Sequence, residues 1–306
     1  MLYVSTRSKT ETFTNYRVLR ENIAADGGFY TPFQLPRYIE EEWKAFGTQR
    51  FSQAVAQILN LFFSAGISSW DIEFLVGRNP VRVLQVQHKL LAGELWHNPA
   101  KTYSYLEQSL WKRICADVSE PPMWCKISVR IAVLFGLYAI VGNLGIHSFD
   151  IAIHADDFSM VVAAQMCRSM GMPVDNIIVD CSESSGVWDF IHHGTLSVSS
   201  RIPECMELFI HHCFGVEETL RFLECRNSRR SYQLNPDNAD WLCKSMFGAV
   251  IGENRAKAVV SSVSRTVGYP VELETAQTYA ALQDYRAASG ENRHTLFLID
   301  RAPSAC

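Results

Sequence analysis

The sequence of 306 residues lacks the short motifs that identify many common sites. Its nine cysteines include no CxxC pair, which argues against a zinc ribbon and against a thioredoxin-type motif. There is also no GxSxG nucleophile elbow, no Walker-type phosphate loop and no GxGxxG turn. We therefore expect reduced, mostly buried thiols in a cytoplasmic protein.

An excess of basic charge and a long uninterrupted apolar run are also missing. The 28 lysines and arginines are outnumbered by 32 aspartates and glutamates, so nothing indicates nucleic-acid binding. The most apolar stretch, residues 127–146, is interrupted by Arg130, Asn143 and three glycines. A membrane-spanning helix needs about 20 predominantly apolar residues. We expect a buried helix here, and neither a nucleic-acid nor a membrane partner.

What the sequence does contain is an alternation of helical and extended patterns. Residues 147–155, HSFDIAIHA, predict a strand, and SMVVAAQMCRSMGM and NIIVDC predict a helix and a second strand. A Gly-Met-Pro break between a helix and an apolar strand is typical of a parallel βαβ unit. The helix LETAQTYAALQDYRAAS and the strand HTLFLID repeat this pattern near the end. The predicted fold is α/β, with a helical N-terminal part packed on a mostly parallel sheet.

Other elements are predicted from apolar spacing, caps and breaks. The expected order is a strand at 2–4, a helix at 12–24 behind a Thr cap, one helix within 40–65, one within 68–90 capped by Ser69, a helix at 105–118, a buried helix at 127–141, a helical region at 200–225, a polar loop at 226–240 and a helix at 241–262.

Several segments, in the right order, resemble threonine synthase, a fold-type II enzyme family that uses pyridoxal phosphate (PLP). YVSTR and ADGGFYTP are similar to the start of that family, and GELWHNPAKTYSYL is similar to its lysine-bearing loop. IAIHADDFSMVVAAQMCRSMGMPVDNIIV resembles its phosphate-loop helix. The resemblance implies an N-terminal domain at 1–92, a remnant of the anchor loop and bridging helix at 93–126, and a large fold-type II α/β domain at 127–306.

The departures from the family pattern concern the cofactor. Ser104 stands at the Schiff-base lysine position, and an alcohol cannot form the imine that PLP chemistry needs. Residues 155–159, ADDFS, replace a glycine-rich phosphate loop and bring two acids toward a phosphate. About twenty residues, 106–126, stand where the family has a small middle domain. We therefore expect no cofactor, and no PLP in particular.

Polar residues remain at the loops of the former site. Elsewhere, the adjacent histidine pairs do not have the spacing of metal ligands, so no metal site is predicted. The HADD stretch, 154–157, follows a predicted strand, where open α/β sheets bind ligands. Alternatively, its two aspartates only cap the next helix. The catalytic candidates are His97, Lys101, His154 and Asp157; the ligand-binding candidates are Arg130, Asp156, Asp157, Ser159 and Asp300.

Two functions are consistent with this pattern. The first is a threonine synthase-like protein that has lost PLP catalysis and acts as a binding or scaffold protein related to amino-acid metabolism. The second is a PLP-independent enzyme acting on an amino-acid-like or phosphorylated metabolite in the former cleft. Loss of the middle domain would expose an inter-domain face, and exposed apolar patches often mark interfaces. We therefore expect a homodimer or a complex with another protein.

Overall fold

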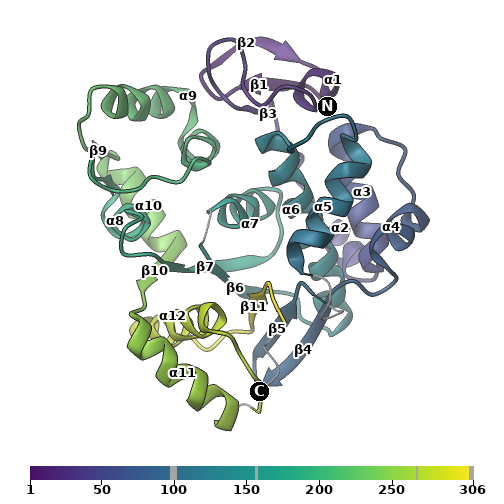
Figure 1. Ribbon diagram of the computed structural model, residues 1–306, viewed down its shortest axis with the longest axis vertical. Coiled ribbons are helices and arrows are strands. Elements are labelled where there is room, and N and C mark those ends of the chain that lie inside the picture. Colours follow the sequence, from purple (N-terminus) through teal and green to yellow (C-terminus); the bar gives the residue numbers. More distant parts are fainter. Residues whose placement is uncertain (97–101, 156–157, 267, 303–306) are drawn as a thin grey trace.

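The computed structural model describes residues 1–96, 102–155, 158–266 and 268–302. A central sheet of six strands crosses the molecule in the order β10-β7-β6-β11-β5-β4 (Figure 1). Only β4 runs antiparallel to its neighbour, so the prediction of a mostly parallel sheet is confirmed. The strands, in chain order, are β4 (Arg82–Gln87), β5 (Leu90–Glu94), β6 (Phe149–His154), β7 (Val174–Cys181), β10 (Met246–Val250) and β11 (Thr295–Ile299).

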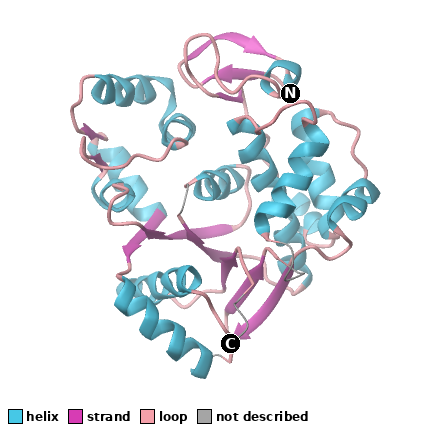
Figure 2. Ribbon diagram, viewed as in Figure 1, coloured by secondary structure: helices cyan, strands magenta, loops and turns pink. Residues whose placement is uncertain are grey.

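Helices surround this sheet, with one group of them on the N-terminal side of the molecule (Figure 2). α3 (Phe51–Phe63) packs against α6 (Met123–Asn143), and Gly136 permits the close approach. A Cβ at Gly136 would lie 2.4 Å from the ring of Phe51. α6 is long and apolar enough to cross a membrane, but 83% of its most apolar window is buried inside the protein. The expected buried helix is therefore present.

The remaining helices connect and cover the sheet. They are α1 (Asn15–Val18), α2 (Glu40–Phe46), α4 (Ser69–Val76), α5 (Tyr103–Ile114), α7 (Ser159–Ser169), α8 (Val187–His193), α9 (Met206–Asn227), α10 (Pro236–Ser245), α11 (Glu253–Thr266) and α12 (Leu273–Ser289). A two-stranded ribbon pairs β8 (Thr195–Leu196) with β9 (Tyr232–Gln233).

Three local predictions were wrong. The helix expected at 12–24 is only the four-residue α1, and the residues before it form β2 (Ser8–Phe13). The helix expected within 68–90 is present as α4, which ends at Val76 before β4 begins at Arg82. Ser68, not Ser69, caps α4 by accepting the Asp71 amide at 3.1 Å. The helix at 241–262 is interrupted by β10, and α10 begins inside the predicted loop.

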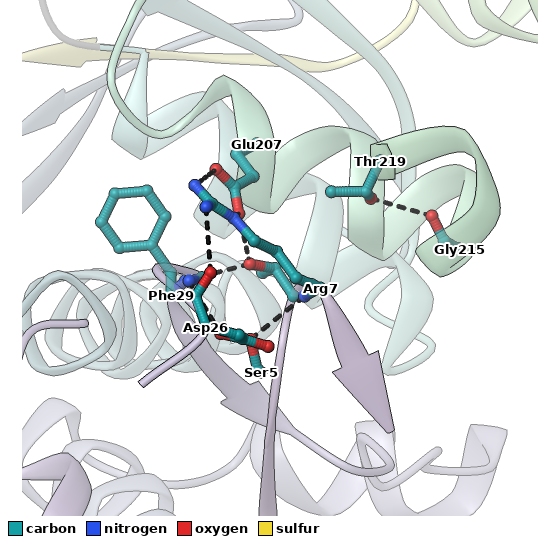
Figure 3. Close-up of polar contacts among 9 residues, drawn as sticks. Ser5, Arg7, Asp26, Phe29, Glu207, Gly215 and Thr219 are labelled. Carbon is teal, nitrogen blue, oxygen red and sulfur yellow. Dashed lines mark hydrogen bonds and ion pairs between the residues drawn. The ribbon is translucent and has the colours of Figure 1, made fainter. Parts of the chain in front are cut away.

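The N-terminal sheet is attached to α9 by a buried carboxylate. β1 (Tyr3–Ser5) lies between β2 and β3 (Tyr30–Pro32). Glu207 accepts hydrogen bonds from Thr6 Oγ1 at 2.5 Å and from Arg7 Nε and Nη2, both at 3.1 Å (Figure 3). Only 3% of Glu207 is exposed. These contacts connect segments that are about 200 residues apart in the chain.

A buried histidine on α9 makes stability depend on pH. Burial lowers the pKa of His211 from 6.5 to about 4, and the charge of Lys9 acts in the same direction. Its Nε2 has no hydrogen-bond partner in the part of the chain that the structure describes.

Because the unfolded chain binds the proton first, stability falls as pH drops from 6.5 to 4. We expect wild type to lose about 2 kcal/mol more than His211→Asn between pH 7 and pH 4.5 in urea unfolding; equal losses would contradict this assignment.

Candidate functional site

A histidine and an aspartate meet at the carboxyl ends of two neighbouring parallel strands. His154 ends β6 and lies in register with Asp180 on β7. His154 Nδ1 is 2.7 Å from Asp180 Oδ2, and the same oxygen accepts a hydrogen bond from Thr278 Oγ1 of α12 at 2.9 Å. Asp180 is 4% exposed. A carboxylate in this place fixes the orientation of the imidazole and stabilises its protonated form.

Arg130 connects three helices beside this pair. Its guanidinium Nε donates to Glu107 Oε1 of α5 at 2.7 Å, and Nη1 donates to Ser159 Oγ at the start of α7. The Arg130 and Glu107 side chains are 9% and 14% exposed. The predicted ligand-binding residues Arg130 and Ser159 are therefore adjacent. They contact each other, so part of their hydrogen-bonding capacity is already used inside the protein.

Asp300 follows β11 and faces the same space. Part of its side chain contacts solvent, yet the surrounding protein raises its pKa to about 6, which the charges of Arg130 and His154 oppose. Its carbonyl oxygen accepts the Tyr103 amide at 3.2 Å. This backbone bond holds the start of α5 against the end of β11. Asp300 therefore places an acidic group at the wall of a pocket.

These groups surround a small pocket of about 190 Å³. Ser104, at the position that the resemblance gives to the Schiff-base lysine, lines it from the first turn of α5. The other described lining residues are Thr102, Tyr103, Glu107, Arg130, His154, Met160, Asp300 and Arg301. The predicted candidates Arg130, His154 and Asp300 thus come together with Ser104, although they lie far apart in the sequence.

A second cavity of about 910 Å³ opens on the other side of His154. It follows the carboxyl ends of β6, β7 and β10 and includes Lys126, Asp180 and Arg201. Four glutamates line it as well, at positions 183, 204, 253 and 274. Its walls therefore carry charges of both signs, which suits a zwitterionic or polar ligand better than an apolar one.

Four predicted residues, His97, Lys101, Asp156 and Asp157, lie outside the described residues. The sequence reasoning missed Glu107, Asp180 and Thr278. Asp180 had a usable signal, because it is the next-to-last residue of an apolar strand and so lies near the strand's carboxyl end. Glu107 and Thr278 lie on helices and had none. Among the described residues, no group of three or more His, Cys, Asp or Glu side chains is placed to hold a metal ion.

The chain is similar to threonine synthases in sequence. Residues 2–79 match the family described as threonine synthase N terminus. Threonine synthase of Pseudomonas aeruginosa is 23% identical over 206 residues, 60% of this chain and 42% of that protein. Mouse threonine synthase-like 2 is 30% identical over 119 residues, 36% of this chain and 24% of that protein. The matched regions therefore span less than half the length of these curated relatives.

Solved structures show the same fold at low identity. PLP-bound threonine synthase from Brucella melitensis superimposes with a TM-score of 0.84 at 13% identity, covering 99% of this chain and 89% of that chain. Yeast threonine synthase gives a TM-score of 0.79 at 12% identity, covering 99% and 87%. The N-terminal family match and the curated relatives agree with this fold. The chain is therefore similar to threonine synthases and has the mixed α/β fold of the solved threonine synthase structures.

Proposed function

We propose that this threonine synthase-like chain has lost PLP-dependent catalysis and serves as a binding or scaffold protein related to amino-acid metabolism. The observation that carries the proposal is Ser104, whose hydroxyl lines the small pocket where the family resemblance places an imine-forming lysine. No lysine is among the described residues that line this pocket. Among the described lining residues, none supplies the amine that PLP needs.

The beginning of α7 also fits PLP poorly. Phe158 precedes this helix with a φ of 61°, a region that favours glycine, and its ring is buried against Phe209 at 5.4 Å. By the resemblance, Phe158 matches a phenylalanine of the family's loop, and the departure at this end of the loop is Ser159, which stands where the family has a glycine. Ser159 Oγ beside it is bonded to Arg130.

Adding PLP to the purified protein tests the loss of catalysis. We expect no specific imine absorption band, and we expect borohydride reduction to label only scattered surface lysines. Lys101→Arg is the matched variant, because Lys101 is close to Ser104 in the sequence. A saturable band in wild type that disappears in Lys101→Arg, with the reduced adduct mapped to Lys101, would contradict the proposal.

A second function is favoured by the His154–Asp180 pair. An imidazole held by a buried carboxylate at 2.7 Å is arranged as a general base, and it faces both cavities. This supports a PLP-independent enzyme acting on a small amino-acid-like or phosphorylated metabolite. His154 would take a proton from the substrate or from water, while Asp180 would stabilise the imidazolium that forms.

A thermal-shift screen against amino acids, homoserine phosphate, nucleotides and divalent metals separates the two functions. A compound that stabilises wild type and His154→Gln equally is bound without help from the histidine. That outcome supports the binding protein. A compound whose conversion, followed by NMR, stops in His154→Gln supports the enzyme. His88→Gln is the control, because His88 is exposed and lies outside both cavities.

We also propose that the chain associates with itself or with another protein through the face left by a missing middle domain. We propose a cytoplasmic location as well. The short connection between α5 and α6, residues 115–122, supports the missing domain, because it is too short to form one.

A further inference from the structure

Two cysteines meet where α5 ends and α6 begins. Cys115 is the C-terminal cap of α5, and Cys125 lies in the first turn of α6. Their Sγ atoms are 3.4 Å apart. Cys115 is 7% exposed and Cys125 is 0% exposed. The two sulfur atoms therefore need to approach by only about 1.4 Å to reach the length of a disulfide bond, about 2.05 Å.

The hydrogen bonds give the two thiols different roles. Cys115 Sγ donates to the Trp111 carbonyl oxygen at 3.3 Å, which leaves Cys125 as the donor in the contact between the sulfurs. This bond from Cys125 lowers the pKa of Cys115 and outweighs the effect of burial. Since the thiolate is the reactive form and Cys115 is the more exposed of the two, Cys115 should react first.

Other buried cysteines show that this arrangement is special to the pair. Burial raises the pKa of both Cys167 and Cys181. Their Sγ atoms contact the backbone carbonyl oxygens of Ile131 and Val179. In the described chain, Cys115–Cys125 is the one thiol–thiol contact at hydrogen-bond distance. Burial alone therefore leaves a thiol protonated and unreactive. The contact between Cys115 and Cys125, in contrast, places two thiols where they can react with each other.

We propose that Cys115 and Cys125 form a redox-active dithiol that a hydroperoxide oxidises to an intrachain disulfide. Cys115 sulfur attacks a peroxide oxygen, the O–O bond breaks, and the departing oxygen leaves as water, giving a sulfenic acid. Cys125 sulfur then attacks the Cys115 sulfur, the S–O bond breaks and a second water leaves. Two thiols lose two electrons and two protons, and hydrogen peroxide is reduced to two waters. A thiol reductant reverses the change.

The disulfide would fix α5 against α6 at one end of their contact. Glu107 and Arg130 join the same two helices further along, beside the small pocket. The covalent link therefore restricts the wall that carries Ser104 and Arg130. In a reducing compartment such a bond would form transiently, as redox-sensing disulfides do. Formation of the bond does not depend on either function proposed above.

The experiment treats the folded protein with a small excess of hydrogen peroxide and maps its peptides without reduction. Cys243→Ser, combined with Cys306→Ser, is the background, because Cys243 is exposed and would cross-link molecules. We expect a peptide joining Cys115 to Cys125 that is two hydrogens lighter than the free pair. Closing this short loop should raise Tm by about 3–5 °C, reversibly with dithiothreitol.

Single variants supply the controls. Cys115→Ser should abolish both the linked peptide and the Tm rise, whereas Cys225→Ser, at a partly buried thiol, should keep both. A substitution at the buried Cys125 could impair folding. The linked peptide is therefore followed in the Cys225→Ser variant, where Cys125 is unchanged. If Cys115 is instead oxidised to sulfinic acid, or both thiols stay reduced while the protein remains folded, the proposal is wrong.

Discussion

Replacing Glu207 with alanine should destabilise the protein by about 2–4 kcal/mol, because it removes a buried carboxylate that three donors share. Thr6 is fully buried, and its hydroxyl would lose the acceptor that lies 2.5 Å away. The Arg7 side chain is 30% exposed, so water would replace part of its lost ion pair and limit the cost. Urea unfolding measures the change.

The same substitution should act first on the N-terminal sheet. Glu207 is the described ion-pair partner that Arg7 has on α9 (Figure 3), so its loss removes this link between the N-terminal sheet and α9, while Tyr3 of β1 still donates to the Phe62 carbonyl oxygen of α3. We expect limited proteolysis to remove the first residues of Glu207→Ala faster than those of wild type. Glu217→Ala, at an exposed position of α9 beyond the kink at Gly215, should change stability by no more than about 0.5 kcal/mol. Equal effects of the two substitutions would contradict this account.

The prediction from sequence succeeded where elements are long and apolar. α6 and the unit β6-α7-β7 were predicted because their apolar runs fit one secondary structure over many residues. β10 was predicted as helix because its five residues, MFGAV, are apolar throughout and fit either pattern. β2 was hidden for the opposite reason, since four of its six residues are exposed and polar. Its strand conformation depends on pairing with β1, which local spacing does not show.

The candidate site was predictable only in part for a related reason. His154 ends β6 and Asp300 directly follows β11, and the carboxyl ends of parallel strands meet at one edge, so their proximity follows from the fold. Arg130 was placed by resemblance, but its partner Glu107 lies 23 residues earlier on another helix. The packing of α5 on α6 decides that contact. No periodicity in the sequence specifies which residues two packed helices bring together.

Arg130→Ala should therefore be the most damaging substitution at the site, at about 3–5 kcal/mol of lost stability. It leaves Glu107, 14% exposed, without its 2.7 Å ion pair and leaves Ser159 without the guanidinium. Arg130→Lys should cost less, because an ammonium keeps the charge but cannot bond both neighbours with a planar fork. Arg78→Ala, an exposed arginine, is the control for loss of a cation.

A double-mutant cycle with Glu107→Gln separates the ion pair from general packing. If Arg130 and Glu107 act as a pair, the double variant should be destabilised by less than the sum of the single variants, by about 1–3 kcal/mol. The pKa of Asp300 gives a second measurement, because the charge of Arg130 opposes the rise in that pKa. In Arg130→Ala that pKa should move above 6, followed by NMR of the Asp300 carboxyl. An additive cycle with an unchanged Asp300 pKa would show that Arg130 contributes packing alone, and the pocket would then lack the electrostatic organisation described for it.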